Sequence, residues 1–304
     1  MKKYIIYPFL LLLLVYLIVI GFFVEFKSYE KVTILDQVSL TYKRRNGVPF
    51  MGISDIAYDK KNNKLYMLSD RSILYNFSAT FEDEIKSIEY DSVHKLRSPL
   101  NKHYDSEGLT LNHKNKLLIA HERFAGVIQV SNDAKVIKSY TLPKKLQKRS
   151  NYRDKNKLLE SIVEHPKYGL LTAVEFPLRK QKRLEFQTIY SLKGKEWHFK
   201  MQNYPNTAIT SMEVMDDNNI LVLERSYRGY FHPIIVTLKK VYLNQCDREN
   251  LCKSERLLSF HSYRGDGFNN FEGLTKVSKK KYVMVSDNNG NRLLPTKLIY
   301  FEVD

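Results

Sequence analysis

Three observations in the sequence predict an all-β fold, a five-bladed β-propeller. A short motif with a carboxylate at each end recurs five times along the chain. The segments after each motif are short and rich in Val, Ile, Tyr and Phe, so each repeat holds about four strands. Four-stranded units repeated about every fifty residues are typical of propeller blades.

The repeated motif is a predicted β-hairpin. In the first repeat, residues 52–71, one strand begins near Ser54, a Lys-Lys-Asn-Asn turn follows, and a second strand ends before Asp70. The four later hairpins have the same plan. They span residues 106–123, 159–176, 211–225 and 271–288.

Each hairpin opens and closes with an acidic residue, here called the opener and the closer. Successive openers lie 52, 53, 53 and 59 residues apart, which gives the repeat period. The closer follows its opener by 15 residues, except in the fourth hairpin, where the separation is 11 and we infer a loss of two residues from each strand. The openers are Asp55, Glu107, Glu160, Glu213 and Glu272, and the closers are Asp70, Glu122, Glu175, Glu224 and Asp287.

The two ends of the repeat array predict how the ring closes. The fifth unit has a single strand after its hairpin, residues 296–303, and an unassigned strand, residues 32–42, precedes the first unit. Because an open ring would leave exposed strand edges, we expect the N-terminal strand to become the outermost strand of the last blade. A six-bladed ring, with strands disguised by long loops, is the alternative. The propeller domain occupies residues 29–304.

The N-terminus is predicted to be a membrane anchor, residues 1–28. Lys2 and Lys3 precede an apolar run, residues 4–24, of about the ~20 residues that cross a bilayer as a helix. No small-residue cleavage site precedes Glu25, which favours an uncleaved signal anchor over a cleaved signal peptide. The positive-inside tendency places the domain on the periplasmic or extracellular side.

The two cysteines, Cys246 and Cys252, lie in a polar segment with five residues between them. This spacing does not fit a redox C-x-x-C pair or a zinc site. In an exported domain a disulfide that closes the loop is expected, and two free thiols are the alternative.

The net charge of +16 raises the question of nucleic-acid binding. The lysines are scattered through turns, and no basic run is interleaved with aromatic residues as in a nucleic-acid-binding module. We therefore expect no nucleic-acid partner. A basic surface on a membrane-anchored protein fits anionic lipid or an anionic substrate better.

The openers predict a calcium site on the propeller axis. In a propeller the inner strands start around the axis, so the five openers should converge there, with the closers in a wider ring. Carboxylates about 5 Å apart repel each other by about 3 kcal/mol at an effective dielectric of about 20, so the ring needs a cation, protons or bases. Ca²⁺ accepts roughly six to eight oxygen ligands. Alternatively, each carboxylate accepts backbone N–H bonds at a turn.

Three closers are followed directly by arginine, namely by Arg71, Arg123 and Arg225. Guanidinium groups above a cation-filled ring would bind a planar anionic group, such as the phosphate or carboxylate of a small ester. Ion pairing of each arginine with the ring is the alternative. Together with Glu122, these arginines are the candidate catalytic residues.

The elements SDIA…LSDR, SEGL…HER and FEGL…SDN, at Ser54, Ser106 and Phe271, resemble the phytase-like domain described as having the "esterase-like activity of phytase". The resemblance covers nearly everything after Val48. It implies a calcium-dependent hydrolase of phosphate or other esters, secreted or anchored outside the cytoplasm. In the hydrolase hypothesis, metal-activated water is the attacking group. A non-catalytic, membrane-tethered binding propeller with a structural calcium is the rival hypothesis.

Overall fold

The computed structural model describes residues 31–97, 104–123, 125–229, 232–264, 270–291 and 294–304. The predicted anchor, residues 1–28, lies outside these ranges. Within them, no helix is both long enough and apolar enough to cross a membrane.

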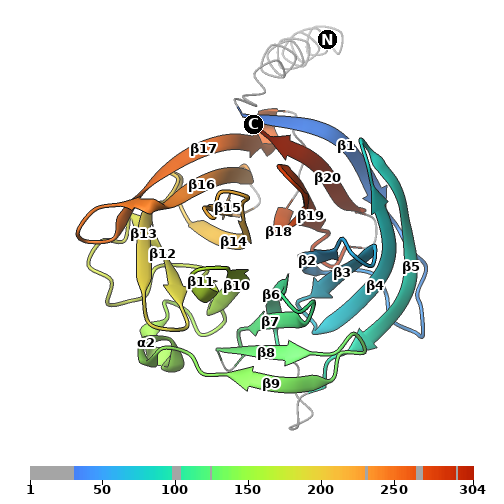
Figure 1. Cartoon of the computed structure of the whole chain (residues 1–304), viewed down its shortest axis with the longest axis horizontal. Coiled ribbons are helices and arrows are strands. Elements are labelled where there is room, and N and C mark those ends of the chain that lie inside the picture. Colours follow the sequence, from blue (N-terminus) through green and yellow to red (C-terminus); the bar gives the residue numbers. More distant parts are fainter. Residues whose placement is uncertain (1–30, 98–103, 124, 230–231, 265–269, 292–293) are drawn as a thin grey trace, which may run out of the picture.

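The described residues form 20 strands, arranged around a central axis as five antiparallel four-stranded units, the blades (Figure 1). Each blade contains consecutive strands, apart from the last one. The first blade is β2 (Ile53–Asp59), β3 (Lys64–Ser69), β4 (Ile73–Phe81) and β5 (Ile85–Lys95). The second is β6 (Ser106–Leu111), β7 (Leu117–His121), β8 (Gly126–Val130) and β9 (Val136–Tyr140).

The remaining blades follow in chain order around the ring (Figure 1). The third is β10 (Leu159–His165), β11 (Gly169–Val174), β12 (Phe186–Ser191) and β13 (Glu196–Lys200). The fourth is β14 (Thr207–Val214), β15 (Ile220–Ser226), β16 (Ile235–Cys246) and β17 (Leu251–His261). The fifth is β18 (Asn270–Ser278), β19 (Lys281–Asp287), β20 (Thr296–Val303) and β1 (Val32–Leu40). Short helical turns are α2 (Lys144–Gln147), η1 (Arg149–Asn151) and η2 (Ser262–Arg264).

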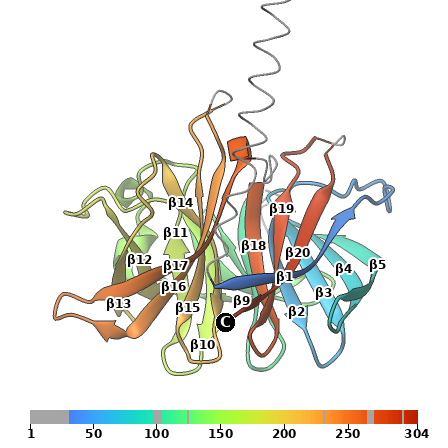
Figure 2. The same cartoon turned by 90° about the horizontal axis from the view of Figure 1, so that it is seen from above.

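The N-terminal strand closes the ring as predicted. β1 pairs antiparallel with β20, from Val32 opposite Val303 to Leu40 opposite Thr296, and Figure 2 shows the two strands side by side. This pairing covers the outer edge of β20. The 20 strands of the described ranges are all used in five blades, which leaves none there for a sixth.

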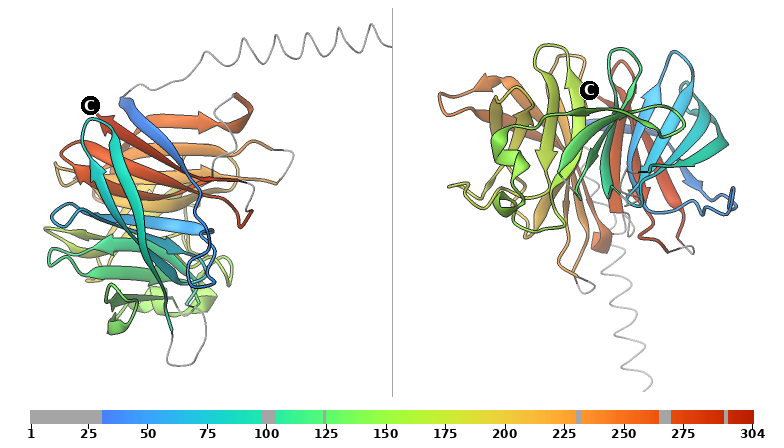
Figure 3. Two further views of the ribbon diagram at one scale, coloured as in Figure 1. Left: turned by 90° about the vertical axis from the view of Figure 1, so that its right-hand side faces the viewer. Right: turned by 90° about the horizontal axis from the view of Figure 1, so that it is seen from below.

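Five hydrophobic clusters hold the blades together, one at each junction between neighbours. Figure 3 shows the blades from the side, standing next to one another around the axis. Because every junction, including the one between the first and last blades, is filled by buried apolar side chains, the ring is closed by packing as well as by strand pairing. Each cluster contains residues of both neighbouring blades, for example Ile56 and Val285, Leu68 and Leu109, Val127 and Ile162, Ile189 and Met212, and Leu221 and Tyr282.

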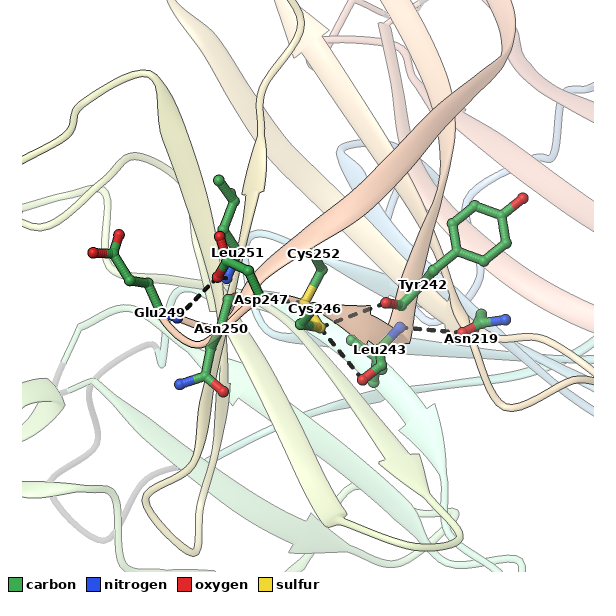
Figure 4. Close-up of a disulfide and its surroundings, with 9 residues drawn as sticks. All are labelled: Asn219, Tyr242, Leu243, Cys246, Asp247, Glu249, Asn250, Leu251 and Cys252. Atoms are coloured by element: carbon green, nitrogen blue, oxygen red, sulfur yellow. Dashed lines mark hydrogen bonds between the residues drawn. A yellow bond between two sulfur atoms is a disulfide. The ribbon is translucent and has the colours of Figure 1, made fainter.

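The third and fourth blades are also joined at their outer strands. β13 pairs parallel with β17, His198 opposite Leu251 and Phe199 opposite Cys252. Cys252 forms a disulfide with Cys246, its partner across the β16–β17 hairpin (Figure 4). The predicted disulfide is therefore confirmed.

A β-bulge marks the start of every inner strand, where one residue is inserted opposite the second strand. The residue after the bulge lies where the inner strands of neighbouring blades approach each other. A Cβ on Gly108 would lie 2.8 Å from the Cα of Ser161, and one on Gly273 would lie 2.7 Å from the Cα of Asp55. The recurring Glu-Gly-Leu sequence thus places glycine where the next blade leaves no room for a side chain. The inserted residues are Ser54, Glu107, Glu160, Thr210 and Glu272.

This register corrects the alignment of the fourth hairpin. Ile209 pairs with Glu224 just before the bulge, as Ser106 pairs with His121 in the second hairpin. Thr210 therefore occupies the opener position and Arg225, 15 residues later, the closer position. The predicted loss of four residues is wrong, because it matched Glu213 and Glu224 by charge and not by register.

Asp55 fills the axis of the ring. Its carboxylate accepts hydrogen bonds from the backbone N–H of Leu109 (2.7 Å), Ile56 (2.9 Å) and Leu274 (3.2 Å) and from the hydroxyl of Ser211 (3.0 Å). Burial raises the pKa of Asp55, and these hydrogen bonds oppose the rise. The side chain links the inner strands of four blades.

We expect Asp55→Asn to destabilise the folded protein by about 3 kcal/mol. The NH₂ group of the asparagine cannot accept hydrogen bonds, so some of the groups that donate to Asp55 would lose their acceptor. Urea unfolding measures the change. Asp83→Asn, at a fully exposed side chain, is the control and should stay within about 0.5 kcal/mol of the wild type. Equal stability of Asp55→Asn and the wild type would contradict a structural role for Asp55.

The disulfide predicts a redox-dependent stability. Cys246 and Cys252 should resist alkylation until the protein is reduced. Replacing both by serine should lower the free energy of unfolding by about 2 kcal/mol, because the closed loop is short. Unfolding of the two forms under non-reducing conditions tests this, and alkylation without reductant would show that the thiols are free.

Candidate functional site

An acidic ring lies at the end of the propeller where the inner strands begin and the second strands end. Three openers belong to it, Glu107, Glu160 and Glu272. Burial raises the pKa of Glu107, and the nearby charges of Glu122 and Glu272 raise it further. Burial also raises the pKa of Glu160, followed by the charges of Glu175 and Glu107. The prediction of an acidic site was therefore correct for these three openers, whose carboxylates lie close enough to other ring carboxylates to repel them.

Two predicted members do not join this ring. Asp55 is held at the axis by its four hydrogen bonds. Glu213 lies three residues beyond the bulge position, and its carboxylate accepts the N–H of Val214 (2.7 Å) and of Lys276 (2.9 Å). The expected convergence of five openers is thus wrong for Asp55 and Glu213. Both carboxylates accept backbone N–H bonds, which was the alternative.

Glu224, the predicted fourth closer, is also outside the ring. Its carboxylate lies 3.4 Å from the ammonium of Lys239 and accepts the N–H of Gln202 at 3.1 Å. Burial raises the pKa of Glu224 and lowers that of Lys239. The ion pair lies within the fourth blade, and the Gln202 hydrogen bond connects this blade to the loop before it.

Arg225 takes the closer position in the fourth blade and places a cation inside the ring. Its guanidinium is paired with Glu272, lies 3.6 Å from the carboxylate of Glu175, and donates to the side chain of Asn270 at 2.9 Å. The side chain is only 19% exposed. Ion pairing, the alternative for the arginines, is present here. Arg71 and Arg123 are exposed, and their catalytic role stays a prediction.

Three carboxylates form a triad at the junction of the second and third blades. Glu122 follows β7, Glu160 lies on β10 and Glu175 follows β11; one oxygen from each lies within 4.8 Å of the others. Burial raises the pKa of Glu122 to about 8, and its carboxylate accepts the N–H of Leu158. Glu160 is 7% exposed and accepts no hydrogen bond within the described residues.

The donor set of the triad fits calcium. All three ligands are carboxylate oxygens, which hard cations such as Ca²⁺ prefer, whereas zinc sites are usually built with His or Cys. The Glu160 carboxylate accepts no hydrogen bond from the residues that the structure describes, which leaves its oxygens available for coordination. The site differs from the predicted one, since it combines one opener with two closers. Neither closer was predicted as a metal ligand: Glu122 was a candidate catalytic residue, and Glu175 had no assigned role.

A cleft of about 290 Å³ adjoins the triad. Glu175 is shared by both, and three cationic side chains line the cleft: Arg153, Lys157 and Arg225. The ammonium of Lys157 lies 2.7 Å from a Glu175 oxygen and 4.8 Å from the ring centre of Phe176. Such a cluster of cations suits an anionic group. Asp154, Asn206, Ala208 and Tyr227 complete the lining.

Sequence reasoning missed Lys157 and Arg153 because they do not belong to the repeat. Lys157 lies three residues before its bulge residue, and the equivalent positions hold Tyr104 in the second hairpin and Thr207 in the fourth. No recurring signal marks such a residue. A larger hollow of about 770 Å³ lies among the hairpin turns of the first three blades and contains none of the ring carboxylates.

The comparisons with known proteins identify a family. The phytase-like family, described as "Esterase-like activity of phytase", matches residues 48–290, most of the propeller. The sequence matches no curated protein.

Several solved structures are similar over nearly the whole chain. The streptogramin B lyase structure is 7% identical, with a TM-score of 0.45 over 91% of this chain and 100% of that chain. The PQQ-bound aldose sugar dehydrogenase from Streptomyces coelicolor is 8% identical, with a TM-score of 0.48 over 90% and 98%. Virginiamycin B lyase from Staphylococcus aureus is 9% identical, with a TM-score of 0.38 over 90% and 99%. At these values the similarity carries no argument about function.

The triad predicts a calcium-dependent stability. Calcium at about 100 times its Kd should stabilise the folded protein by about 2.7 kcal/mol, because it binds the folded state alone. Glu160→Gln removes one ligand charge at nearly constant volume and should remove most of this effect. Thermal unfolding with calcium and with a chelator measures it.

Glu213→Gln is the matched control for this prediction, since Glu213 is an opener outside the triad. Its calcium effect should equal that of the wild type. If Glu213→Gln loses the effect while Glu160→Gln keeps it, the metal lies elsewhere on the propeller.

Proposed function

Because the chain belongs to the phytase-like family, we propose that it is a calcium-dependent hydrolase of phosphate or other esters. The single observation that carries this proposal is the position of the buried triad next to a cleft lined by cations. A hard metal ion and an anionic group of a small ester can then bind side by side, which is the arrangement that metal-assisted ester hydrolysis requires.

In this proposal the residues have three roles: metal binding, orientation of the substrate's anionic group, and contact with the rest of the substrate. Glu122, Glu160 and Glu175 would hold the ion, which supplies Lewis acidity when bound. Arg153 and Arg225 orient the anionic group of the substrate through charge-assisted hydrogen bonds. Phe176 offers an aromatic surface to the part of the substrate next to that group.

We also propose that the protein acts outside the cytoplasm, anchored by residues 1–28. The disulfide between Cys246 and Cys252 supports an oxidising compartment. The apolar run at residues 4–24 supports the anchor.

A membrane-tethered binding propeller with a structural calcium is the second candidate. The observation that favours it is the place of Glu122, which belongs to the triad and accepts the N–H of Leu158. Glu122 is therefore committed to the metal, and the hydrolase has no general base assigned outside the triad.

The proposed function is tested with phosphomonoesters and carboxylesters, each with calcium and with a chelator. The wild type should hydrolyse at least one ester class only with calcium. Arg153→Ala should raise the KM for an anionic ester about tenfold, the effect of one lost charge-assisted contact, and leave the calcium effect on thermal unfolding intact.

Arg248→Ala, at an exposed position in the β16–β17 turn, is the matched control and should leave the KM unchanged. A calcium effect on unfolding without hydrolysis of any ester would favour the binding propeller.

A further inference from the structure

Lys157 and the metal site share one carboxylate, that of Glu175. The ammonium of Lys157 lies 2.7 Å from Oε1 of Glu175, and Glu175 is one of the three carboxylates of the triad. The carboxylate is 5% exposed, so it is nearly removed from water, and Lys157 partly neutralises it. In this arrangement a side-chain cation is paired with a carboxylate that a metal ion in the triad would use.

The triad is nevertheless incompletely satisfied. Glu160 is 7% exposed and accepts no hydrogen bond within the described residues, although its oxygen lies within 4.8 Å of oxygens of Glu122 and Glu175. A buried carboxylate without donors is costly to keep ionised. Lys157 therefore neutralises only one of the three carboxylates, whereas a bound cation would contact all three.

Lys157 can leave Glu175 without burying its charge. Its side chain is 39% exposed, and it lines the cleft together with Arg153, where its ammonium lies 4.8 Å from the ring centre of Phe176. Arg225 is less free, because it also pairs with Glu272 and its side chain is 19% exposed. Of the two cations at Glu175 Oε1, Lys157 is the one that can move into the cleft.

We propose that Lys157 is a tethered competitor of the metal ion. A divalent cation bound to the triad displaces the Lys157 ammonium from Glu175, and the released ammonium then binds the anionic group of a ligand in the cleft. This inference rests on the metal site of the proposed function.

The displacement couples two binding events. Because the ion and the ammonium compete for the carboxylate of Glu175, an anion that captures the ammonium favours metal binding. By thermodynamic linkage the metal strengthens anion binding by the same factor. Lys157 thereby makes the cleft attractive to anions mainly when the metal site is filled.

Binding measurements on the full chain test this proposal, with Ca²⁺ alone and with sulfate as a stable dianion. Lys157→Met keeps the length of the side chain and removes the charge. Calcium should bind Lys157→Met about fivefold more tightly than the wild type, the equilibrium equivalent of losing one partly exposed competing ion pair. The factor by which calcium strengthens sulfate binding should fall at least about threefold in the variant.

Lys155→Met, an exposed lysine in the same loop, is the matched control and should behave like the wild type in both titrations. Weaker calcium binding by Lys157→Met would overturn the proposal, since Lys157 would then hold Glu175 in place for the metal. Unchanged calcium binding and unchanged coupling would overturn it as well. If the wild type binds no calcium, the metal site of the proposed function fails too, which separates the two failures.

Discussion

The propeller depends on one carboxylate at its axis. The inner strands of the blades approach so closely there that the position after each bulge holds Gly108, Ser161, Ser211 or Gly273, and only the first blade has a longer side chain, Asp55. That side chain accepts two N–H groups that follow the glycines, Leu109 and Leu274, and the hydroxyl of Ser211. Without it, buried donors from several blades would face an empty channel, at a cost of about 1–3 kcal/mol for each donor left unsatisfied. The small residues therefore allow the inner strands to approach closely, and the single aspartate satisfies the donors that this approach buries.

The position of the acidic ring follows from this close approach of the inner strands. Because the bulge is fixed by close contact at the axis, the inserted residue and the closer of every blade are directed to the same end of the propeller. Four blades place acid at the closer position, and three place acid at the bulge. Close carboxylates with raised pKa values destabilise a protein that has no counter-ion, and sites of this kind are retained for function more often than for stability. The repulsion within the ring is thus offset by the hydrogen bonds of Asp55 and by the burial of apolar side chains at the five junctions between blades.

The sequence predicted most of the fold because apolar patterns and repeat spacing are properties of the backbone register. The strand at residues 296–303, the closure by the N-terminal strand and the disulfide were all predicted correctly. The site was harder to predict, because the presence of an acidic residue does not reveal its position relative to the bulge. Asp55 lies one residue after its bulge and Glu213 three residues after, so both were taken for ring members. The turn asparagines, Asn115 and Asn218, lie eight residues after Glu107 and Thr210 and have positive φ angles, and they would have given the correct alignment.

The asymmetry of the fourth blade determines where a ligand can bind. A ring with an acid at every position would draw a cation toward the axis, but there the channel is filled by Asp55. Arg225 stands at the closer position of the fourth blade and pairs with Glu272, while Glu122, Glu160 and Glu175 form the triad between the second and third blades. That junction opens beside the cleft lined by Lys157 and Arg153. The arginine at this closer position therefore adds a cation to the cleft, and Glu175 belongs to both the cleft and the triad.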